Sequence, residues 1–449
     1  MASDAAAGSG GLVTAKTDAA DAPYDVPDQS ENLDEVAATG DTLDDIRRGE
    51  AQQQQQQQTS PEEKAQQAYQ VSRLATQLYT LSYLVFFSFL GTLARVGLSH
   101  LTTYPGAPSI FPTLWANVGG SFIMGFLVED RKLFRHEWGT PAYDQALQRA
   151  RRAKAAADEE NAGRARSSSS NISSSSSIGL AAAKKAHLAT KKTIPLYIGL
   201  TTGFCGSFTS FSTFIRDVFL ALSNDMVSPD LHGAAPAHRN GGYSFMALLA
   251  VIIETVGLSL GAYIAGMHLG AALEPYTPSI PFRFARGVLD KLAVLLGWGC
   301  WLGAILLAIF PPRNYWRGTA VFAIVFAPLG TLARFYLSML LNAKRPSFPL
   351  GTFAANVLGT AILGMAWDIA HSAGAGRGVL GCQLLQGVED GFCGCLTTVS
   401  TWVSELCSLR RRSAYVYGVA SVVLSTALMI AIMGGLRWTQ GFAPLQCHP

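Results

Sequence analysis

Two short segments of the chain combine glycine and hydroxyl side chains inside long apolar runs. The first, Gly203–Phe214, reads GFCGSFTSFSTF, and the second, Gly391–Trp402, reads GFCGCLTTVSTW. A glycine-rich interruption in a membrane helix frees backbone carbonyl and amide groups, which are tolerated only where they face protein, water or an ion. Two such interruptions at matching positions of two halves predict an ion-binding site near the middle of a membrane.

The composition places these segments in a membrane protein. Hydrophobic residues make up 49% of the 449 residues, and charged residues only 14%. Apolar segments near the ~20 residues that cross a bilayer cover residues 78–100, 111–129, 194–222, 243–270, 289–310, 318–341, 348–369, 379–407 and 414–435. The net charge of +3 gives no reason to expect a nucleic-acid partner.

The remaining chemistry of the sequence does not indicate an enzyme. We find no set of nucleophile and base and no cysteine spacing typical of a zinc site. Six of the seven cysteines lie within or beside apolar segments, where a small soft side chain simply packs. We therefore expect no disulfide.

Three motifs occur twice and in the same order. Gly91–Arg95 (GTLAR) returns 239 residues later as Gly330–Arg334, and Asn117 corresponds to Asn356 at the same offset. The interrupted segments are the third pair, at an offset of 188, because the first half carries a long hydrophilic insertion at 130–193. Each half therefore contains four helices.

The helix left over between the halves, 289–310, sets the architecture. Four crossings return the chain to its starting side, so one more crossing delivers the second half in the opposite orientation. We expect an all-α integral membrane protein with nine transmembrane helices: two inverted four-helix repeats joined by one linker transmembrane helix, with the third helix of each repeat broken. Two inverted halves in one chain suggest that a monomer suffices.

The distribution of charge between the helices gives the orientation. Lysine and arginine residues gather in the loops on the side of the N-terminus, which the positive-inside rule assigns to the cytoplasm. The C-terminus is then extracellular. The expected parts are a disordered cytoplasmic tail (1–73), a first repeat with a cytoplasmic insertion (74–275, insertion 130–193), a linker (276–317), a second repeat (318–436) and an extracellular tail (437–449).

Two asparagines, Asn117 and Asn356, stand mid-helix among apolar neighbours. Their amides could donate hydrogen bonds to a partly dehydrated anion. The alternative is that they join neighbouring helices through hydrogen bonds worth about 1 kcal/mol in lipid. Their matched placement in the two halves leaves both interpretations open.

The aromatic pair Phe211 and Phe214 flanks two hydroxyls, Ser212 and Thr213, on one helical face. Aromatic edges carry positive quadrupole density and can receive an anion, while hydroxyls supply donors. Ordinary packing is the alternative for any such pair. The adjoining polar interruption favours the ion-binding interpretation.

Two arginines, Arg95 and Arg334, lie several residues inside the ends of their helices. They could attract anions to a vestibule, or they could snorkel to the interface or cap helix C-termini. Asp217 and Glu405 lie at matched positions beyond the aromatic site, where they could hold a partner arginine or reach the interface.

The last apolar segment carries one polar stripe at i, i+4 and i+8, formed by Tyr417, Ser421 and Ser425. A ladder of hydroxyls suits an anion that loses its water stepwise. The corresponding helix of the first half has Thr255 and Ser259 and lacks the tyrosine.

Together these motifs resemble the CrcB/Fluc fluoride channel family, and more closely its tandem eukaryotic form, the fluoride exporter FEX. The resemblance implies passive, selective fluoride export across the plasma membrane, with two antiparallel units that create two pores. It also implies a structural sodium ion (Na+) held by the backbone carbonyls of Gly206, Thr209, Gly394 and Thr397. The pore groups that it implies are Asn117, Asn356, Phe211, Ser212, Thr213, Phe214, Ser400, Thr401, Tyr417, Ser421 and Ser425.

The sequence departs from that family at Val399 and Trp402, where the family places two phenylalanines. The two pores are therefore not expected to be equivalent, and the second could be vestigial. A proton-coupled small-molecule antiporter of the duplicated four-helix type is the alternative function. It needs a carboxylate at the membrane midplane in each half, and Glu254 has no counterpart in 414–435.

Overall fold

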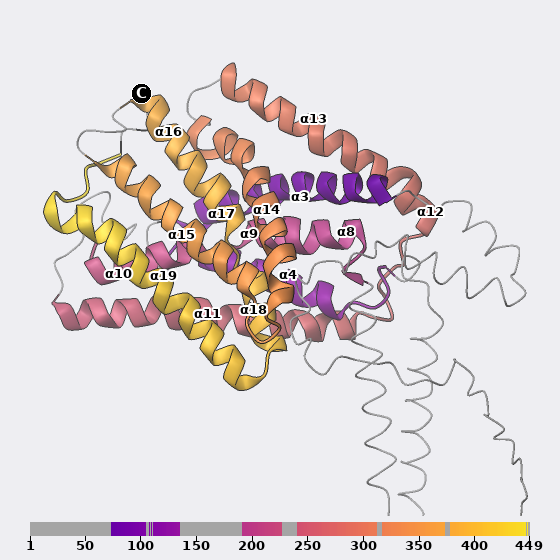
Figure 1. Ribbon diagram of the computed structural model, residues 1–449, viewed down its shortest axis with the longest axis horizontal. Coiled ribbons are helices and arrows are strands. Elements are labelled where there is room, and N and C mark those ends of the chain that lie inside the picture. The colour runs from indigo at the N-terminus through magenta and orange to yellow at the C-terminus, as the bar shows by residue number, and fades with distance from the viewer. Residues whose placement is uncertain are drawn as a thin grey trace, which may run out of the picture. The chain divides into compact units, whose positions relative to one another are not determined.

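The computed structural model describes residues 73–104, 107, 109, 111–134, 191–226, 240–311, 317–372, 378–445 and 447. Within these residues all regular structure is helical, as predicted (Figure 1). The predictions for the N-terminal tail and for nearly all of the insertion lie outside the described residues.

Six stretches of helix in the described part are long and apolar enough to cross a membrane, which confirms a multi-pass membrane protein. They are α3 (Arg73–Thr102), α11 (Gly241–Ala272), α12–η3–α13 (Phe282–Phe284, Ala285–Leu289, Asp290–Ile309), η4–α14–η5 (Arg317–Val321, Phe322–Leu341, Asn342–Lys344), α15 (Leu350–His371) and α19 (Arg411–Thr439). A shorter apolar helix, α4 (Leu114–Glu129), lies between α3 and the first interrupted segment.

The first glycine-hydroxyl segment interrupts its helix. The chain forms α8 (Pro195–Ile198), the wide π-helical turn η1 (Gly199–Cys205) and the short α9 (Gly206–Phe208). Thr209 and Ser210 are extended, and α10 (Phe211–Ser223) begins after them. The predicted break is therefore present.

The second segment repeats this pattern. It consists of α16 (Val379–Gly387), η6 (Val388–Cys393) and α17 (Gly394–Leu396), an extended Thr397, and α18 (Ser400–Ser408). Both halves of the chain thus carry a broken helix at the matched position.

The short helices α9 and α17 contact each other, and α3 and α14 pack against both of them. Glycines allow this close approach. A Cβ atom at Gly91 of α3 would collide with the Phe204 carbonyl oxygen, and one at Gly330 of α14 would collide with the Phe392 carbonyl oxygen. The duplicated GTLAR motifs therefore make the same contact in both halves.

The helices on either side of this centre also pair in a matched way. In the first half α4 packs closely on α11, where side chains at Gly125 or Gly266 would collide with the facing backbone. In the second half α15 packs on α19, with Gly364 facing Met429. The second and fourth helices of each half therefore approach each other over glycine.

Several helix boundaries differ from the predicted ones by a few residues. Helix α3 begins at Arg73 and not at 78, and the linker helix begins at Phe282 and not at 289. Helix α4 begins at Leu114 and not at 111, because a turn at Pro112 and Thr113 precedes it.

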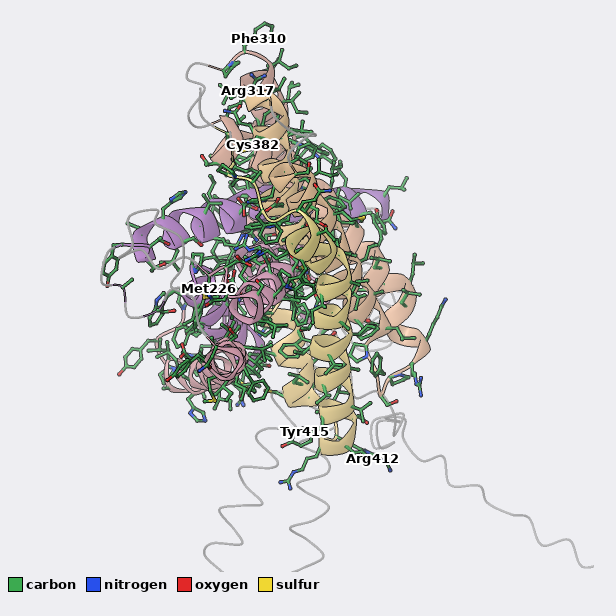
Figure 2. All side chains as sticks on the ribbon, turned by 90° about the vertical axis from the view of Figure 1, so that its left-hand side faces the viewer. Met226, Phe310, Arg317, Cys382, Arg412 and Tyr415 are labelled. Carbon is green, nitrogen blue, oxygen red and sulfur yellow. A yellow bond between two sulfur atoms is a disulfide. The ribbon has the colours of Figure 1, made fainter. Side chains whose placement is uncertain are left out.

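A disulfide joins Cys382 and Cys447, so the expectation of no disulfide is wrong. Cys382 lies in α16, and Cys447 lies in the segment after α19. That segment turns back onto the bundle, since the Ala443 amide donates to the His371 carbonyl at 2.8 Å and the Gln383 side chain donates to the Cys447 carbonyl at 3.1 Å. Figure 2 places Cys382 near Arg317 and Phe310, toward the end opposite Arg412 and Tyr415.

Candidate ion site

Each interruption supplies the N-cap acceptor for the helix that follows the other interruption. The first amides of a helix have no partner within it and need an outside acceptor. Thr397 Oγ1, from the second break, accepts from the amides of Phe211 (3.2 Å) and Ser212 (3.1 Å) at the start of α10. Thr209 Oγ1, from the first break, accepts from the amides of Val399 and Ser400 at the start of α18, at 3.1 Å each. Each half therefore caps a helix of the other.

The two matched asparagines clamp the residues of the breaks. Asn356 lies well inside α15, but Asn117 is the fourth residue of α4 and not mid-helix as predicted. Asn117 Oδ1 accepts from the Ser210 amide at 2.8 Å, and Asn117 Nδ2 donates to the Ser210 carbonyl at 3.4 Å. Asn356 makes the same two contacts with Thr398, at 2.8 and 3.2 Å. The amides thus join helices at the break itself, and Nδ2 retains a second proton for another acceptor.

The two arginines of the GTLAR motifs are buried at the same place. Their guanidinium groups donate to backbone carbonyls of both broken helices. The acceptors are Ser207 (2.7 Å), Gly394 (2.9 Å) and Asp390 for Arg95, and Thr202 (2.6 Å) and Cys395 (2.9 Å) for Arg334. These contacts match the capping alternative, because the carbonyls belong to helical segments that end at the breaks.

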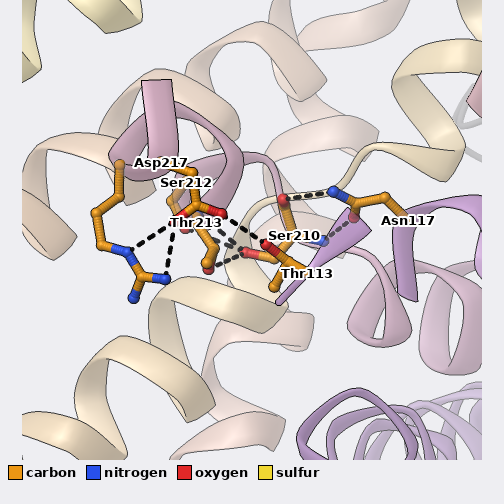
Figure 3. A network of polar contacts seen from close by, with 7 residues as sticks. Thr113, Asn117, Ser210, Ser212, Thr213 and Asp217 are labelled. Carbon is orange, nitrogen blue, oxygen red and sulfur yellow. Dashed lines mark hydrogen bonds and ion pairs between the residues drawn. The ribbon is translucent and has the colours of Figure 1, made fainter. Parts of the chain in front are cut away.

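A threonine and a carboxylate pair in each half, and Figure 3 shows the pair of the first half. Thr113 donates to Asp217 Oδ2 at 3.1 Å, and Arg216 forms an ion pair with Asp217 Oδ1 at 3.1 Å. In the second half Thr352 donates to Glu405 Oε1 at 2.6 Å. Both carboxylates are buried and so do not reach the membrane interface. Asp217 pairs with Arg216, which agrees with the predicted arginine partner.

Three aromatic rings gather beside the breaks and are buried. Phe211 meets Phe214 edge-on at 5.6 Å between centroids, and it meets Trp402 in the same manner at 5.4 Å. The α10 helix contacts α15 and α19, so Phe211 lies on a helix that packs against the helix carrying the hydroxyl ladder of the second half. Val399, also buried, contributes no ring at the matched position.

The hydroxyl ladder of α19 is buried along its length. Tyr417 donates to Glu405 Oε2 at 2.5 Å, and Ser421 donates to the Tyr417 carbonyl at 2.8 Å. Ser425 Oγ has no hydrogen-bond partner among the described residues. A buried hydroxyl in that state is available to an ion.

The matching stripe on α11 can be only partly recognised from the sequence. Thr255 and Ser259 are buried, and Tyr263 continues the stripe one turn beyond them. The Tyr263 hydroxyl hydrogen-bonds with Ser404 of α18 at 2.9 Å. Tyr263 could have been found from the sequence, because Thr255, Ser259 and Tyr263 are spaced i, i+4 and i+8. The tyrosine comes last in this stripe, whereas Tyr417 comes first in the stripe of the last helix.

The four predicted pore hydroxyls of the broken helices are buried between the two halves: Ser212, Thr213, Ser400 and Thr401. Ser212 Oγ donates to the Cys393 carbonyl at 3.4 Å, and Ser400 Oγ donates to the Cys205 carbonyl at 3.1 Å. These serines therefore also connect one half to the other.

Glu254 lies on the outer face of α11 and is exposed. The buried face of the same helix carries Thr255 and Ser259. An antiporter would need its carboxylate inside the bundle, so this position does not favour that alternative.

The backbone at the breaks has the donor set of a hard-cation site. Because the amides of residues 210 and 398 bond to asparagine side chains, the carbonyls of Gly206 and Gly394 lose their helical donors. Thr209 and Thr397 follow in extended conformation. Carbonyl oxygens are the ligands that hard cations prefer, and these carbonyls fit such an ion. The Arg95 guanidinium, which donates to Gly394, and the Arg334 guanidinium, which lies against Gly206, would be its neighbours.

Lys191 precedes the first broken helix and lies outside the expected spans. Its ammonium donates to the Leu127 carbonyl at 2.6 Å and to the Asp130 carbonyl, and so caps the C-terminus of α4. Burial lowers the pKa of Lys191 from 10.5 to about 8.

One known protein family matches both halves of the chain. The family model described as "CrcB-like protein, Camphor Resistance (CrcB)" matches residues 82–267 and 321–436. The chain belongs to this CrcB family. The two matched stretches contain both broken helices, both asparagines and both arginines, and they leave the CrcB chain's linker helix between them.

Several proteins related to this CrcB chain are named for fluoride. Fluoride export protein 1 of Neurospora crassa is 58% identical over 392 residues, which cover 84% of this chain and 70% of that protein. Fluoride export protein 1 of Candida albicans is 32% identical over 78% of each chain. The fluoride-specific ion channel FluC of Pseudomonas aeruginosa is 34% identical over 130 residues, which are 28% of this chain and 98% of that protein. No solved structure matches the chain.

Proposed function

We propose that this CrcB protein exports fluoride passively and selectively across the plasma membrane. The observation that carries the proposal is the meeting of two broken helices whose caps are exchanged between the halves. Buried asparagines, aromatic edges and hydroxyls surround this point, and these groups can replace the water around a small anion. Relatives named for fluoride export and for a fluoride-specific channel support the choice of ion.

The working pore combines Phe211 and Phe214 with the ladder of Tyr417, Ser421 and Ser425. This assignment is supported by the packing of α10 on α19 and by the edge-on contacts of Phe211. The second pore would use the α11 stripe, and Val399 supplies no ring to it. We propose that it conducts less or not at all.

The halves are inverted, with nine crossings, a cytoplasmic N-terminus and an extracellular C-terminus. Six long helical spans, the short α4 and two broken helices in the described part support this topology. The disulfide of Cys447 supports an outer position, because disulfides persist in oxidising compartments. Arg412, at the opposite end in Figure 2, is then cytoplasmic.

A structural sodium ion is part of the proposal. The carbonyls of Gly206, Thr209, Gly394 and Thr397 would hold it. The ion would supply a fixed positive charge for the carbonyl ends of the short helices α9 and α17. The protein would act as a monomer, with this ion between its two halves.

Efflux from liposomes tests the function. Purified protein is reconstituted in vesicles loaded with potassium fluoride. A potassium ionophore is added so that K+ leaves with fluoride and no membrane potential builds up, and a fluoride electrode records the release. Rapid release without an imposed proton gradient is expected, together with much slower release of chloride. Release that requires a proton gradient would favour the antiporter, and no release would refute fluoride export.

A further inference from the structure

Trp402 holds a buried hydrogen-bond donor that the fold leaves unused. The side chain is 1% exposed, and its indole Nε1 has no hydrogen-bond partner among the described residues. Buried N–H groups are paired in most proteins, so an exception calls for a missing acceptor. A phenylalanine, which the matched residue Phe214 supplies in the first half, would fill the space without this donor.

The ring lies in the candidate working pore. On one side it meets Phe211 edge-on at 5.4 Å between centroids. The ring also approaches α19, since its Cζ2 carbon would lie 3.8 Å from a Cβ atom at Gly418. The indole therefore stands beside the helix that carries Tyr417 and Ser421.

On α19 the two ladder hydroxyls on either side of Gly418 in the sequence already have acceptors. Tyr417 donates to Glu405, and Ser421 donates to the backbone carbonyl of the preceding turn. An anion entering here would find two oxygens whose protons point elsewhere. The Trp402 N–H has no acceptor in the described part of the chain, and neither has Ser425 Oγ further along the ladder.

We propose that the indole N–H of Trp402 binds the permeating fluoride ion as a hydrogen-bond donor beside Phe211. From there the ion passes to the Ser425 end of the ladder. The proposal rests on fluoride export as the function. A hydrogen bond to a charged acceptor is about twice as strong as a neutral one, and this would offset the cost of an unpaired N–H in the core.

The test uses the full-length protein and Trp402→Phe, which keeps an aromatic ring and removes the donor. Initial efflux rates from liposomes are measured over a range of fluoride concentrations. We expect the half-saturating concentration to rise about tenfold in the variant, as for loss of one hydrogen bond to a charged group. Trp438→Phe is the matched control, because Trp438 is 61% exposed at the far end of α19, and it should behave as the parent.

A second measurement reports on the N–H itself. The protein is labelled with 15N-tryptophan, and the indole resonance absent from Trp402→Phe is followed by NMR during titration with sodium fluoride or sodium chloride. A fluoride-dependent shift of that resonance is expected, with little response to chloride. An unmoved resonance would overturn the proposal even if the variant conducts poorly, because the ring alone would then account for the loss.

An unchanged concentration dependence in Trp402→Phe would also overturn the proposal, since the donor would not lie on the permeation path. Both outcomes differ from failure of the proposed function, in which the parent protein itself releases no fluoride.

Discussion

The exchanged caps predict that one threonine in each half stabilises the fold of the other half. We consider Thr397→Val, which keeps the shape of the side chain and removes its hydroxyl. The change leaves two amides at the start of α10 without their acceptor. The Cys393 carbonyl loses one donor and keeps Ser212.

The magnitude follows from those lost contacts. Losing an N-cap costs about 1 kcal/mol, and each buried donor left unpaired costs about 1–3 kcal/mol. We therefore expect Thr397→Val to lower the free energy of unfolding by about 2–4 kcal/mol. Thr92→Val is the control, because Thr92 is equally buried and its hydroxyl contacts the Cys395 thiol at 3.0 Å, with no helix-start amide bonded to it in the described part of the chain. That change should cost about 1 kcal/mol or less.

Thermal unfolding in detergent, followed by circular dichroism, measures the difference. Thr397→Val should unfold at least about 4 °C below the parent, on the scaling known for domains of moderate size. Thr209→Val should behave like Thr397→Val, since it removes the reciprocal cap. Equal losses for Thr397→Val and the Thr92 control would refute the reasoning, because the cap would then be worth no more than one thiol contact.

Three further predictions concern the pore and Lys191. Phe211→Ile should abolish fluoride efflux from liposomes while Val399→Ala leaves most of it, and equal effects would contradict the asymmetry of the pores. Asn117→Asp and Asn356→Asp should each reduce efflux at least about tenfold, because a carboxylate cannot donate and repels the anion; intact flux in both would leave the amides a purely structural role. Burial lowers the pKa of Lys191 from 10.5 to about 8 in the folded protein. Between these two pH values the folded protein has lost the Lys191 proton and the unfolded chain still holds it. The free-energy cost of burying the charged ammonium therefore disappears as the pH rises from 8 to 10.5. The unfolding temperature of the parent should therefore rise from pH 8 to pH 10.5 relative to Lys191→Met, and a constant difference between them would contradict this assignment.

The breaks could be predicted from the sequence because their cause is local. Clustered glycine and hydroxyl residues weaken a helix and leave polar groups that lipid cannot satisfy, so a run that contains them is expected to open toward protein, water or an ion. Duplication of the segment strengthens the interpretation. The apolar length likewise locates each spanning helix, with errors of a few residues where turns such as Pro112 decide the boundary.

The contacts across the centre could not be predicted, because they join residues far apart in the chain. Nothing in the types of Thr209 and Thr397 shows that each caps the opposite helix. Burial of Arg95 against carbonyls of the other half depends on where the breaks meet. The direction in which Glu254 faces likewise depends on the packing of α11.

The disulfide shows another limit of the sequence. Apolar surroundings indicate simple packing for Cys382, and the partner Cys447 stands in a short segment whose path depends on contacts with His371 and Gln383. The path of that segment, and not its composition, brings the two sulfur atoms together.

That covalent link also gives the molecule a built-in marker of sidedness. The bridge encloses α17, α18 and α19, so its reduction should loosen the second half while the first keeps its own helices. Both cysteines are buried, so a reductant that cannot cross the lipid would reach the bridge only when the C-terminal segment opens locally, and from one compartment only. Intact cells and inside-out vesicles would then give opposite results, without any tag on the chain.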